Sequence, residues 1–431
     1  MNTIFQKLIL VLIMLLAIPS EAYSLVSDSQ RLNLHEKDNV IGKSFTLSSK
    51  ILNEDRDIQI FLPESYHSSK QSYPVLFILD GQRLFTLGVS LSQSFRSTVK
   101  MSPEFIVVGI NNKYPDRFSH FVKNDFLAFI EQELITTLDK NYRTSKERIL
   151  FGWEYAGAYT IESLISKPTL FSGHIAASPF PIDESWYAKK SRIDQLAGKL
   201  NIDLKSHLYI SVSEGEGSVI TGTEKLNTLL VKAAPDSLRW KYRVIQGEEH
   251  ISTAHASLFQ GLKHYFYGYK VFHIEGLEQF QKAGGLSNFY AYNKNRAQRY
   301  GFSEENEPWS MFTIVRNAIR ANDFESFELF MNEFKSSNMI EKIKLSRSNS
   351  IAKFYLQNKK ANKAIGIYKT LAKLNPENAK IQHEIGRIYL MLNNKKITKI
   401  YYQKAVKLAL LSKDNKLTEY QKDLEQLLQQ Y

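Results

Sequence analysis

The most informative absence in this chain of 431 residues is cysteine, of which there is none. Without cysteine there is no disulfide scaffold, no thiolate zinc site, no cysteine nucleophile and no lipid on an N-terminal cysteine. The sequence also lacks a Walker-type phosphate loop, and its ten histidines form no cluster with carboxylates at metal-ligand spacing. Its aromatic residues are scattered through apolar segments instead of alternating with basic ones. We therefore expect no metal, no cofactor and no nucleic-acid partner.

Long hydrophobic runs are also absent, except at the N-terminus. Residues 8–18 form an apolar run of about half the roughly 20 residues that a membrane-spanning helix needs. Ser20 and Ala22 then fit a signal-peptidase site, which predicts a signal peptide over residues 1–22 and cleavage before Tyr23. The alternative is an uncleaved anchor. We expect a periplasmic or secreted protein with no transmembrane segment in the mature chain.

Acidic residues are scarce only near the C-terminus. Residues 341–431 hold 19 Lys+Arg and 7 Asp+Glu, which accounts for the whole net charge of +12, and the other 340 residues hold 37 of each sign. This distribution indicates a neutral body followed by a basic module. Most such lysines only form a solvated face, and the alternative is a partner such as an anionic peptide or a cell-envelope surface.

Short apolar segments alternate with helical patterns through the first part of the chain. The predicted strands cover residues 58–62, 73–79, 105–110, 148–151, 174–178, 208–212 and 240–245. Apolar residues at helical spacing predict helices over 121–138 and 156–165. This alternation predicts an α/β fold with a mostly parallel sheet covered on both faces. Such sheets carry their sites in loops at the carboxyl ends of the strands.

Beyond residue 269 the strand signals fade. We assign residues 23–269 to the α/β domain, 270–308 to a connector with a helix or two, and 309–431 to an all-α domain. Within that domain three pairs of similar residues lie 34 positions apart: Ile351 and Ile385, Tyr355 and Tyr389, Tyr368 and Tyr402. Small and aromatic residues at these offsets resemble tetratricopeptide repeats. The alternative is a plain helical hairpin with accidental similarity.

The segment 126–157 resembles part of a known enzyme family. It contains a Glu-Leu pair, a Tyr-Arg-Thr turn, an arginine, an apolar strand and the turn Gly152-Trp153-Glu154-Tyr155-Ala156-Gly157. Together with Asp80-Gly81 upstream and Gly247-Glu248-Glu249-His250 downstream, it resembles the esterase family of α/β-hydrolases. That family includes enterochelin and other siderophore esterases and S-formylglutathione hydrolase. The resemblance covers residues 43–411, because a subgroup carries tetratricopeptide repeats after the esterase domain, and it implies an α/β-hydrolase fold.

The family's nucleophile position carries a glutamate in this chain. The family has a Gly-x-Ser-x-Gly elbow, in which a sharp turn between strand and helix lifts a serine above the sheet. Here that residue is Glu154, which is anionic at neutral pH and has no proton to give. Two interpretations follow. Either Glu154 is a nucleophile or general base, as aspartate is in haloalkane dehalogenases and epoxide hydrolases, or it inactivates the site by pairing with His250.

The resemblance also implies the other site residues. His250 occupies the place of the family's catalytic base. The acid would follow the predicted strand 208–212, with Glu216 as the first candidate and Glu214 as the second. The backbone amides of Tyr155 and Gln82 would hold the oxyanion. For His250 and both glutamates the alternative is an ordinary solvated loop residue.

Three functions are compatible with these features. The first is an exported esterase-fold protein with an altered or inactive site, which acts as a binding or scaffold module for a small-molecule ester or related ligand. The second is an active hydrolase of siderophore-type or acyl esters that uses Glu154. The third is an interaction protein in which only the basic repeats matter. The loops over 82–100, 111–124 and 180–199 give no indication of a particular substrate.

Overall fold

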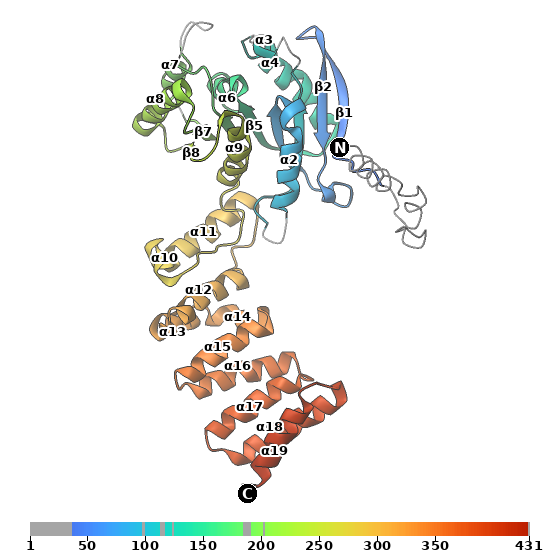
Figure 1. The fold of residues 1–431 in the computed structure, drawn as a ribbon, viewed down its shortest axis with the longest axis vertical. Coiled ribbons are helices and arrows are strands. Elements are labelled where there is room, and N and C mark those ends of the chain that lie inside the picture. The colour runs from blue at the N-terminus through green and yellow to red at the C-terminus, as the bar shows by residue number, and fades with distance from the viewer. Residues whose placement is uncertain are drawn as a thin grey trace, which may run out of the picture. The chain divides into compact units, whose positions relative to one another are not determined.

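The computed structural model describes residues 37–96, 100–112, 117–122, 125–183, 191–200 and 203–429. The predicted signal peptide, residues 1–22, lies outside these ranges. The fold described below is that of the compact unit Ser44–Tyr431 (Figure 1). Within the described ranges no helix has the length and apolar character that crossing a bilayer requires.

The α/β part is built on an eight-stranded sheet. In spatial order its strands are β1 (Lys43–Ser49), β2 (Glu54–Phe61), β4 (Ile106–Ile110), β3 (Tyr73–Leu79), β5 (Thr144–Trp153), β6 (Gly173–Ala177), β7 (Ser206–Ser213) and β8 (Leu238–Ile245). The six strands from β4 to β8 in this order pair in parallel, and β2 pairs antiparallel with β4. The predicted mostly parallel sheet is confirmed, and each predicted strand overlaps one of these strands. β1 was not predicted, because most of its side chains are exposed and it has no apolar pattern.

Helices cover both faces of this sheet. They are α2 (Gly81–Phe95), α3 (Arg117–Val122), α4 (Asp125–Ala128), the π-helical η4 (Phe129–Ile135), α5 (Thr136–Asn141), α6 (Tyr155–Ser166), α7 (Arg192–Ala197), α8 (Gly217–Ala233) and α9 (His250–Tyr265), with a short 3₁₀ turn η3 (Glu64–His67) before β3. All seven residues of β3 are buried. Phe77 packs in the same core as Phe126 and Phe129, whereas Ile78 packs in a second core with residues of α2 and α9. Alternate β3 side chains therefore enter two helical layers, as expected for a parallel sheet with both faces covered.

The rest of the chain is helical within the described residues. The helices are α10 (Leu277–Lys282), α11 (Gly285–Tyr300), α12 (Pro308–Arg320), α13 (Phe324–Glu333), the 3₁₀ turn η5 (Lys335–Ser337), α14 (Met339–Lys342), α15 (Leu345–Gln357), α16 (Ala361–Leu374), α17 (Ala379–Met391), α18 (Lys395–Ser412) and α19 (Leu417–Gln429). The pair α17 and α18 begins 34 residues after the pair α15 and α16. This spacing equals the repeat found in the sequence, and the assignment to the tetratricopeptide class stays a prediction.

The predicted connector, residues 270–308, contains α10 and α11. Its buried Phe272, Phe280 and Phe289 belong to one hydrophobic core with residues of α12 to α17. The connector helices therefore pack with the helices that follow them in sequence.

Close helix packing at Gly386 gives a testable prediction. A Cβ atom on Gly386 of α17 would lie 2.5 Å from Cδ1 of Tyr402, and the Tyr402 ring is buried and stacks on His383 with centroids 4.9 Å apart. We expect Gly386→Ala to lower the free energy of unfolding of the helical region by about 1–3 kcal/mol, because the buried ring must shift from its stacking contact with His383 to make room for the methyl group. Urea unfolding followed by circular dichroism measures this loss.

Gly366→Ala is the matched control for that change. Gly366 lies inside α16, and a Cβ atom there would meet nothing within 4 Å. Since alanine favours helix over glycine, we expect Gly366→Ala to stabilise the protein by about 0.5–1 kcal/mol. If both variants shift the unfolding curve in the same direction, the packing of α17 on α18 is not as described.

Candidate active site

Glu154 forms a sharp turn between strand and helix. β5 ends at Trp153 and α6 begins at Tyr155, so that Glu154 alone makes the turn, with φ 61° and ψ −121°. A positive φ is costly for a residue with a side chain and persists only where the surroundings impose it. In α/β-hydrolases this turn carries the nucleophile. The structure thus brings Glu154 to the position expected from the sequence.

Two glycines allow the turn to be this tight. A Cβ atom on Gly152 would lie 2.1 Å from the carbonyl oxygen of Ala156, and one on Gly157 would lie 2.6 Å from that of Ala177. The backbone N–H of Glu154 donates to the Ala177 carbonyl at 3.0 Å, which ties the turn to β6. Glycine is therefore required on both sides of Glu154 by the close approach of backbone to backbone.

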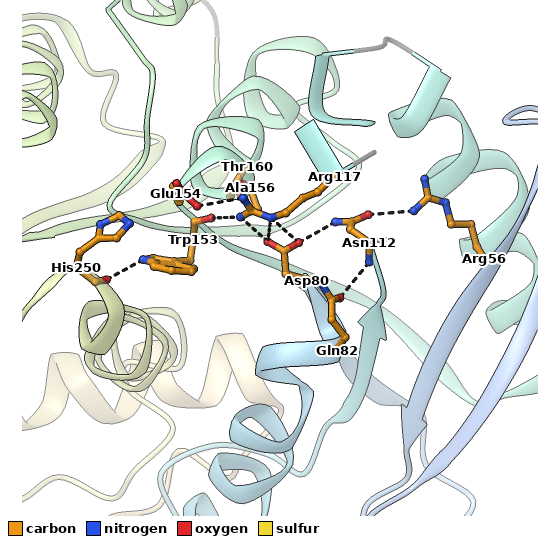
Figure 2. Close-up of polar contacts among 10 residues, drawn as sticks. All are labelled: Arg56, Asp80, Gln82, Asn112, Arg117, Trp153, Glu154, Ala156, Thr160 and His250. Carbon is orange, nitrogen blue, oxygen red and sulfur yellow. Dashed lines mark hydrogen bonds and ion pairs between the residues drawn. The ribbon is translucent and has the colours of Figure 1, made fainter. Parts of the chain in front are cut away.

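An arginine holds the Glu154 carboxylate. Arg117 Nη1 lies 3.0 Å from Glu154 Oε2, and the same guanidinium binds Asp80 through Nε and Nη2 at 2.8–3.1 Å (Figure 2). The exposed fractions of the three side chains are 16% for Arg117, 27% for Glu154 and 0% for Asp80. Burial opposes the charge on Arg117, but the hydrogen bonds and charges of Asp80 and Glu154 outweigh it and raise the pKa of Arg117. Arg117 is a fixed cation shared by two carboxylates.

This arrangement corrects one of the sequence interpretations. We considered a salt bridge between Glu154 and His250, but among the described residues the ion pair of Glu154 is with Arg117 and that of His250 is with Glu216. The reason is the strand order. β4, β3 and β5 are neighbours, so Arg117, Asp80 and Glu154, which follow these strands, meet at one edge of the sheet.

Arg117 is the site residue that the sequence analysis missed. It lies in the segment 111–124, which gave no indication of a particular substrate. It is 37 residues from both Asp80 and Glu154, so no local spacing connects the three. The available signal was weak: a charged residue shortly after a buried strand, at the end of the sheet where sites gather.

Asp80 anchors a wider network of polar groups, in which Arg56 and Asn112 are also buried. Its backbone is left-handed (φ 56°) just before α2, and its Oδ1 accepts a hydrogen bond from Asn112 Nδ2 at 3.1 Å. Asn112 Oδ1 accepts from Arg56 Nη1 at 3.1 Å, and the Asn112 N–H donates to Gln82 Oε1 at 3.0 Å (Figure 2). Each of these groups is hydrogen-bonded to at least one neighbour, so the Asp80 carboxylate is held in place. Asp80 in turn fixes the position of Arg117.

His250 and Glu216 form a second, separate pair. His250 Nδ1 lies 3.1 Å from Glu216 Oε2. Glu216 also accepts hydrogen bonds from three hydroxyls and one backbone N–H: Ser178 Oγ and Ser213 Oγ at 2.7 Å, Ser213 N at 3.1 Å and Thr253 Oγ1 at 3.2 Å. Burial disfavours this carboxylate, but the hydrogen bonds from Ser213, Ser178 and His250 outweigh it and lower the pKa of Glu216. Glu216 is thus an anion held to orient His250.

The second acid candidate lies elsewhere. Glu214 accepts a hydrogen bond from the backbone N–H of Gly247 at 2.9 Å and thereby closes the loop before α9. Of the two candidates, the structure brings Glu216 to His250. On its other side the His250 ring packs against Trp153 at 4.9 Å between centroids, and Trp153 Nε1 donates to the His250 carbonyl at 3.0 Å (Figure 2).

The two predicted oxyanion amides lie in the first turns of helices. Gln82 is the second residue of α2 and Tyr155 the first residue of α6. Backbone N–H groups in a first helical turn have no acceptor within the helix, and the helix dipole adds a positive potential there. Arg117 contacts Asp80 and Glu154, the residues just before these helices, so its guanidinium adds a third positive group at the same place.

Other chemistry finds little support in the described part of the chain. Thr160 is buried, and its hydroxyl donates to the Ala156 carbonyl at 2.8 Å, so it does not face the site. Within the residues that the structure covers, no group of three or more His, Asp or Glu side chains is arranged to hold a metal ion. The arrangement offers an oriented histidine, two helix N-termini and a carboxylate that is bound by an arginine.

Comparison with known proteins agrees with this fold. Residues 49–261 match the model of the family described as Putative esterase. The ferri-bacillibactin esterase BesA of Bacillus subtilis (strain 168) is 24% identical over 160 residues, which are 30% of this chain and 55% of that protein. The uncharacterized protein YbbA of the same organism is 24% identical over 144 residues, 29% of this chain and 57% of that protein. The chain thus spans about half the length of the curated relatives it matches.

Solved structures extend the likeness in fold. An IroE-like serine hydrolase from Shewanella oneidensis matches with a TM-score of 0.50 and 22% identity, over 68% of this chain and 98% of that one. An uncharacterised protein from Capnocytophaga ochracea DSM 7271 matches with a TM-score of 0.51 and 17% identity, over 88% of this chain and 99% of that one. At these identities the structures support the α/β-hydrolase fold and nothing more specific. The esterase pattern and the match over residues 49–261 show that this part of the chain is similar to the Putative esterase family.

Proposed function

We propose that this protein is an esterase-family member with an inactive hydrolytic site, which binds a small-molecule ester or a related ligand instead of hydrolysing it. The observation that carries the proposal is the ion pair between Arg117 and Glu154 at the elbow. A carboxylate that accepts a charge-assisted hydrogen bond from a guanidinium has one of its oxygen atoms occupied. Such a group is a poor nucleophile, and it has no proton for His250 to remove.

Charge balance supports this proposal. Glu154 at the elbow would repel the negative oxygen that forms when a nucleophile attacks an ester. The single positive charge of Arg117 offsets one of the two negative charges of Asp80 and Glu154 and so stabilises Glu154 in a site that is only partly exposed. A partly buried carboxylate without this partner would cost several kcal/mol. With one positive and two negative charges, the elbow keeps a net negative charge, which is unfavourable for a developing oxyanion.

The relatives indicate the kind of ligand. The curated relative BesA is described as a ferri-bacillibactin esterase. By this likeness we propose that the ligand is a siderophore-type or acyl ester. From the N-terminal sequence we propose that the protein is exported, and the basic module after residue 340 remains a predicted docking region for an anionic peptide or envelope surface.

The complete His250–Glu216 pair favours a second candidate function, an active hydrolase. In that reaction a Glu154 oxygen attacks the ester carbonyl carbon and a mixed anhydride forms, while the alkoxide takes a proton from the protonated His250 and leaves as the alcohol. Water, deprotonated by His250, then hydrolyses the anhydride and regenerates the Glu154 carboxylate. This route requires Glu154 to leave Arg117 before it attacks.

A hydrolysis assay separates the two candidates. We expect the purified wild-type protein to hydrolyse p-nitrophenyl acetate and butyrate no faster than Glu154→Ala does, since the proposed site has no working nucleophile. Turnover by the wild type that is lost in Glu154→Ala, together with a glutamyl adduct in mass spectra of the trapped protein, would establish the hydrolase instead. Glu154→Gln is the matched control, because it keeps the length and polarity of the side chain.

A further inference from the structure

A second pocket lies at the opposite edge of the sheet from Glu154. It has a volume of about 440 Å³, and its lining includes Arg239, Tyr267, Arg296, Arg299 and Tyr300. Arg239 is the second residue of β8 and so lies at the amino ends of the parallel strands. Glu154 and His250 instead follow the carboxyl ends of β5 and β8. This pocket is therefore separate from the candidate active site.

Positive charge in this pocket is incompletely compensated. Among the described residues no carboxylate forms an ion pair with Arg239, whose guanidinium carbon lies 4.5 Å from the centre of the Tyr267 ring. Arg299 has one acidic neighbour, Glu147, with 3.9 Å between Nη2 and Oε1, which is long for an ion pair. Arg296, the third arginine of the lining, is engaged by the Tyr269 carbonyl at 2.9 Å and by Glu307 at 3.6 Å.

Burial and the positive charge in the pocket lower the pKa values of neighbouring basic groups. Burial, and then the charge of Arg299, lowers the pKa of Arg239. His207 and His264 also lie close by: burial together with the charges of Arg299 and Arg239 lowers the pKa of His207 to about 3, and burial with Arg239, Lys241 and Arg299 lowers that of His264 to about 4. Both histidines are therefore neutral at pH 7 and add no compensating or competing charge.

Tyrosine rings form much of the rest of the pocket. The Arg299 guanidinium carbon lies 4.9 Å from the centre of the Tyr300 ring, and the Tyr300 hydroxyl donates to the Tyr267 carbonyl at 3.4 Å. Tyr267 is 57% exposed, so its ring is accessible to a ligand. Arginine is the side chain that best binds phosphate and carboxylate groups, and aromatic rings stack on planar ligands.

We propose that this pocket binds a small organic anion, with its phosphate or carboxylate group on Arg239 and Arg299 and its planar ring against Tyr267 and Tyr300. An anion bound there supplies the negative charge that Glu147 alone does not. The site is independent of Glu154, so it can be present whether or not the esterase site is active.

Calorimetric titration of the full chain at constant ionic strength tests this proposal. Phenyl phosphate, benzoate and inorganic phosphate are the three probes. We expect phenyl phosphate or benzoate to bind with one site per chain, and the tighter of the two identifies the preferred anionic group. Inorganic phosphate should bind at least about tenfold more weakly than the better aromatic anion, because it lacks a ring to place on the tyrosines.

Three variants make the test specific. Arg239→Gln should weaken binding of the better probe at least about tenfold, since it removes one charge-assisted contact. Arg243→Gln is the matched control: Arg243 is exposed, lies on the same strand and is not among the lining residues, so this variant should bind like the wild type. Tyr267→Leu changes an exposed side chain and should weaken the aromatic probes more than inorganic phosphate.

Several results would overturn the proposal. One is the absence of binding heat with both aromatic anions in the wild type. Another is an equal loss of affinity in Arg239→Gln and Arg243→Gln, which would mean that overall charge alone attracts the probe. A third is inorganic phosphate binding as tightly as phenyl phosphate, which would remove the role of the tyrosines. Circular dichroism of each variant shows that a loss of binding is not a loss of fold.

Discussion

Glu154→Ser is expected to give this protein esterase activity on p-nitrophenyl butyrate about 10²-fold above that of the wild type. The substitution places a hydroxyl at the elbow, where the backbone turn already exists. His250, oriented by Glu216 at 3.1 Å, is available to take its proton. The N–H groups at the start of α2 and α6 can then stabilise the oxyanion, as in a serine hydrolase.

Arg117 strengthens this expectation. In Glu154→Ser the guanidinium keeps its paired contact with Asp80, but Nη1 loses Glu154 as its acceptor. A positively charged donor then faces the elbow without a partner. Because it lies beside the helix N-termini, it can add to the stabilisation of the developing negative charge.

Two controls isolate the role of the serine hydroxyl. Glu154→Ala removes the same carboxylate but supplies no nucleophile, so it should stay at the wild-type level. The double variant Glu154→Ser, His250→Ala should lose most of the gain, because the serine then has no general base. If Glu154→Ser is no more active than Glu154→Ala, the His250–Glu216 pair is not aligned with the elbow, and more than one residue separates this site from an esterase.

Asp80→Ala is expected to lower the free energy of unfolding by about 3–5 kcal/mol, the range observed when one partner of a buried ion pair is removed. Asp80 is fully buried, and Arg117, 16% exposed, would keep only Glu154 as a charged partner. Asn112 would lose an acceptor as well, and alanine tolerates the left-handed backbone at this position less well than aspartate does. Urea unfolding followed by circular dichroism measures the change.

A second substitution shows whether the unpaired arginine is the cause. Arg117→Met in the Asp80→Ala background removes the charge that has lost its partner, so the double variant should recover part of the stability. Asp236→Ala changes an exposed aspartate in a turn and should alter stability by no more than about 0.5 kcal/mol. If the double variant is less stable than Asp80→Ala alone, the loss comes from the backbone turn and not from the charge.

The sequence was sufficient for the architecture of the α/β part. β3 and β4 are continuous apolar runs, and such runs form strands that are buried on both faces. β1 was not predicted, because its side chains are mostly exposed and the strand is recognised only by its pairing with β2. Within the predicted helix 121–138, the described residues 121–122 and 125–138 are helical, but the π-helical segment Phe129–Ile135 could not be foreseen from spacing alone.

For the candidate active site, the sequence was sufficient to name candidate residues. The structure was needed to show which of them form hydrogen bonds or ion pairs with one another. The place of Glu154 at the elbow could be predicted from the glycines around a strand end. A turn this tight requires Gly152 and Gly157 because backbone atoms approach both of them closely. The candidates Glu214 and Glu216 could not be separated from the sequence, since they are two residues apart in one loop. Only the structure shows that the Glu216 side chain is hydrogen-bonded to His250, whereas the Glu214 side chain accepts a hydrogen bond from Gly247.

The sequence by itself thus determined the sheet, the 34-residue spacing of the later helices, the absence of cysteine chemistry and the glutamate at the elbow. Only the tertiary structure decided that Arg117 lies against Asp80 and Glu154, and that Arg239 and Arg299 line one pocket. The physical reason is that strand and helix patterns are local, whereas an ion pair depends on which strands are neighbours. The spatial order β4, β3, β5 brings together charges 37 residues apart, and no periodicity in the chain encodes that order.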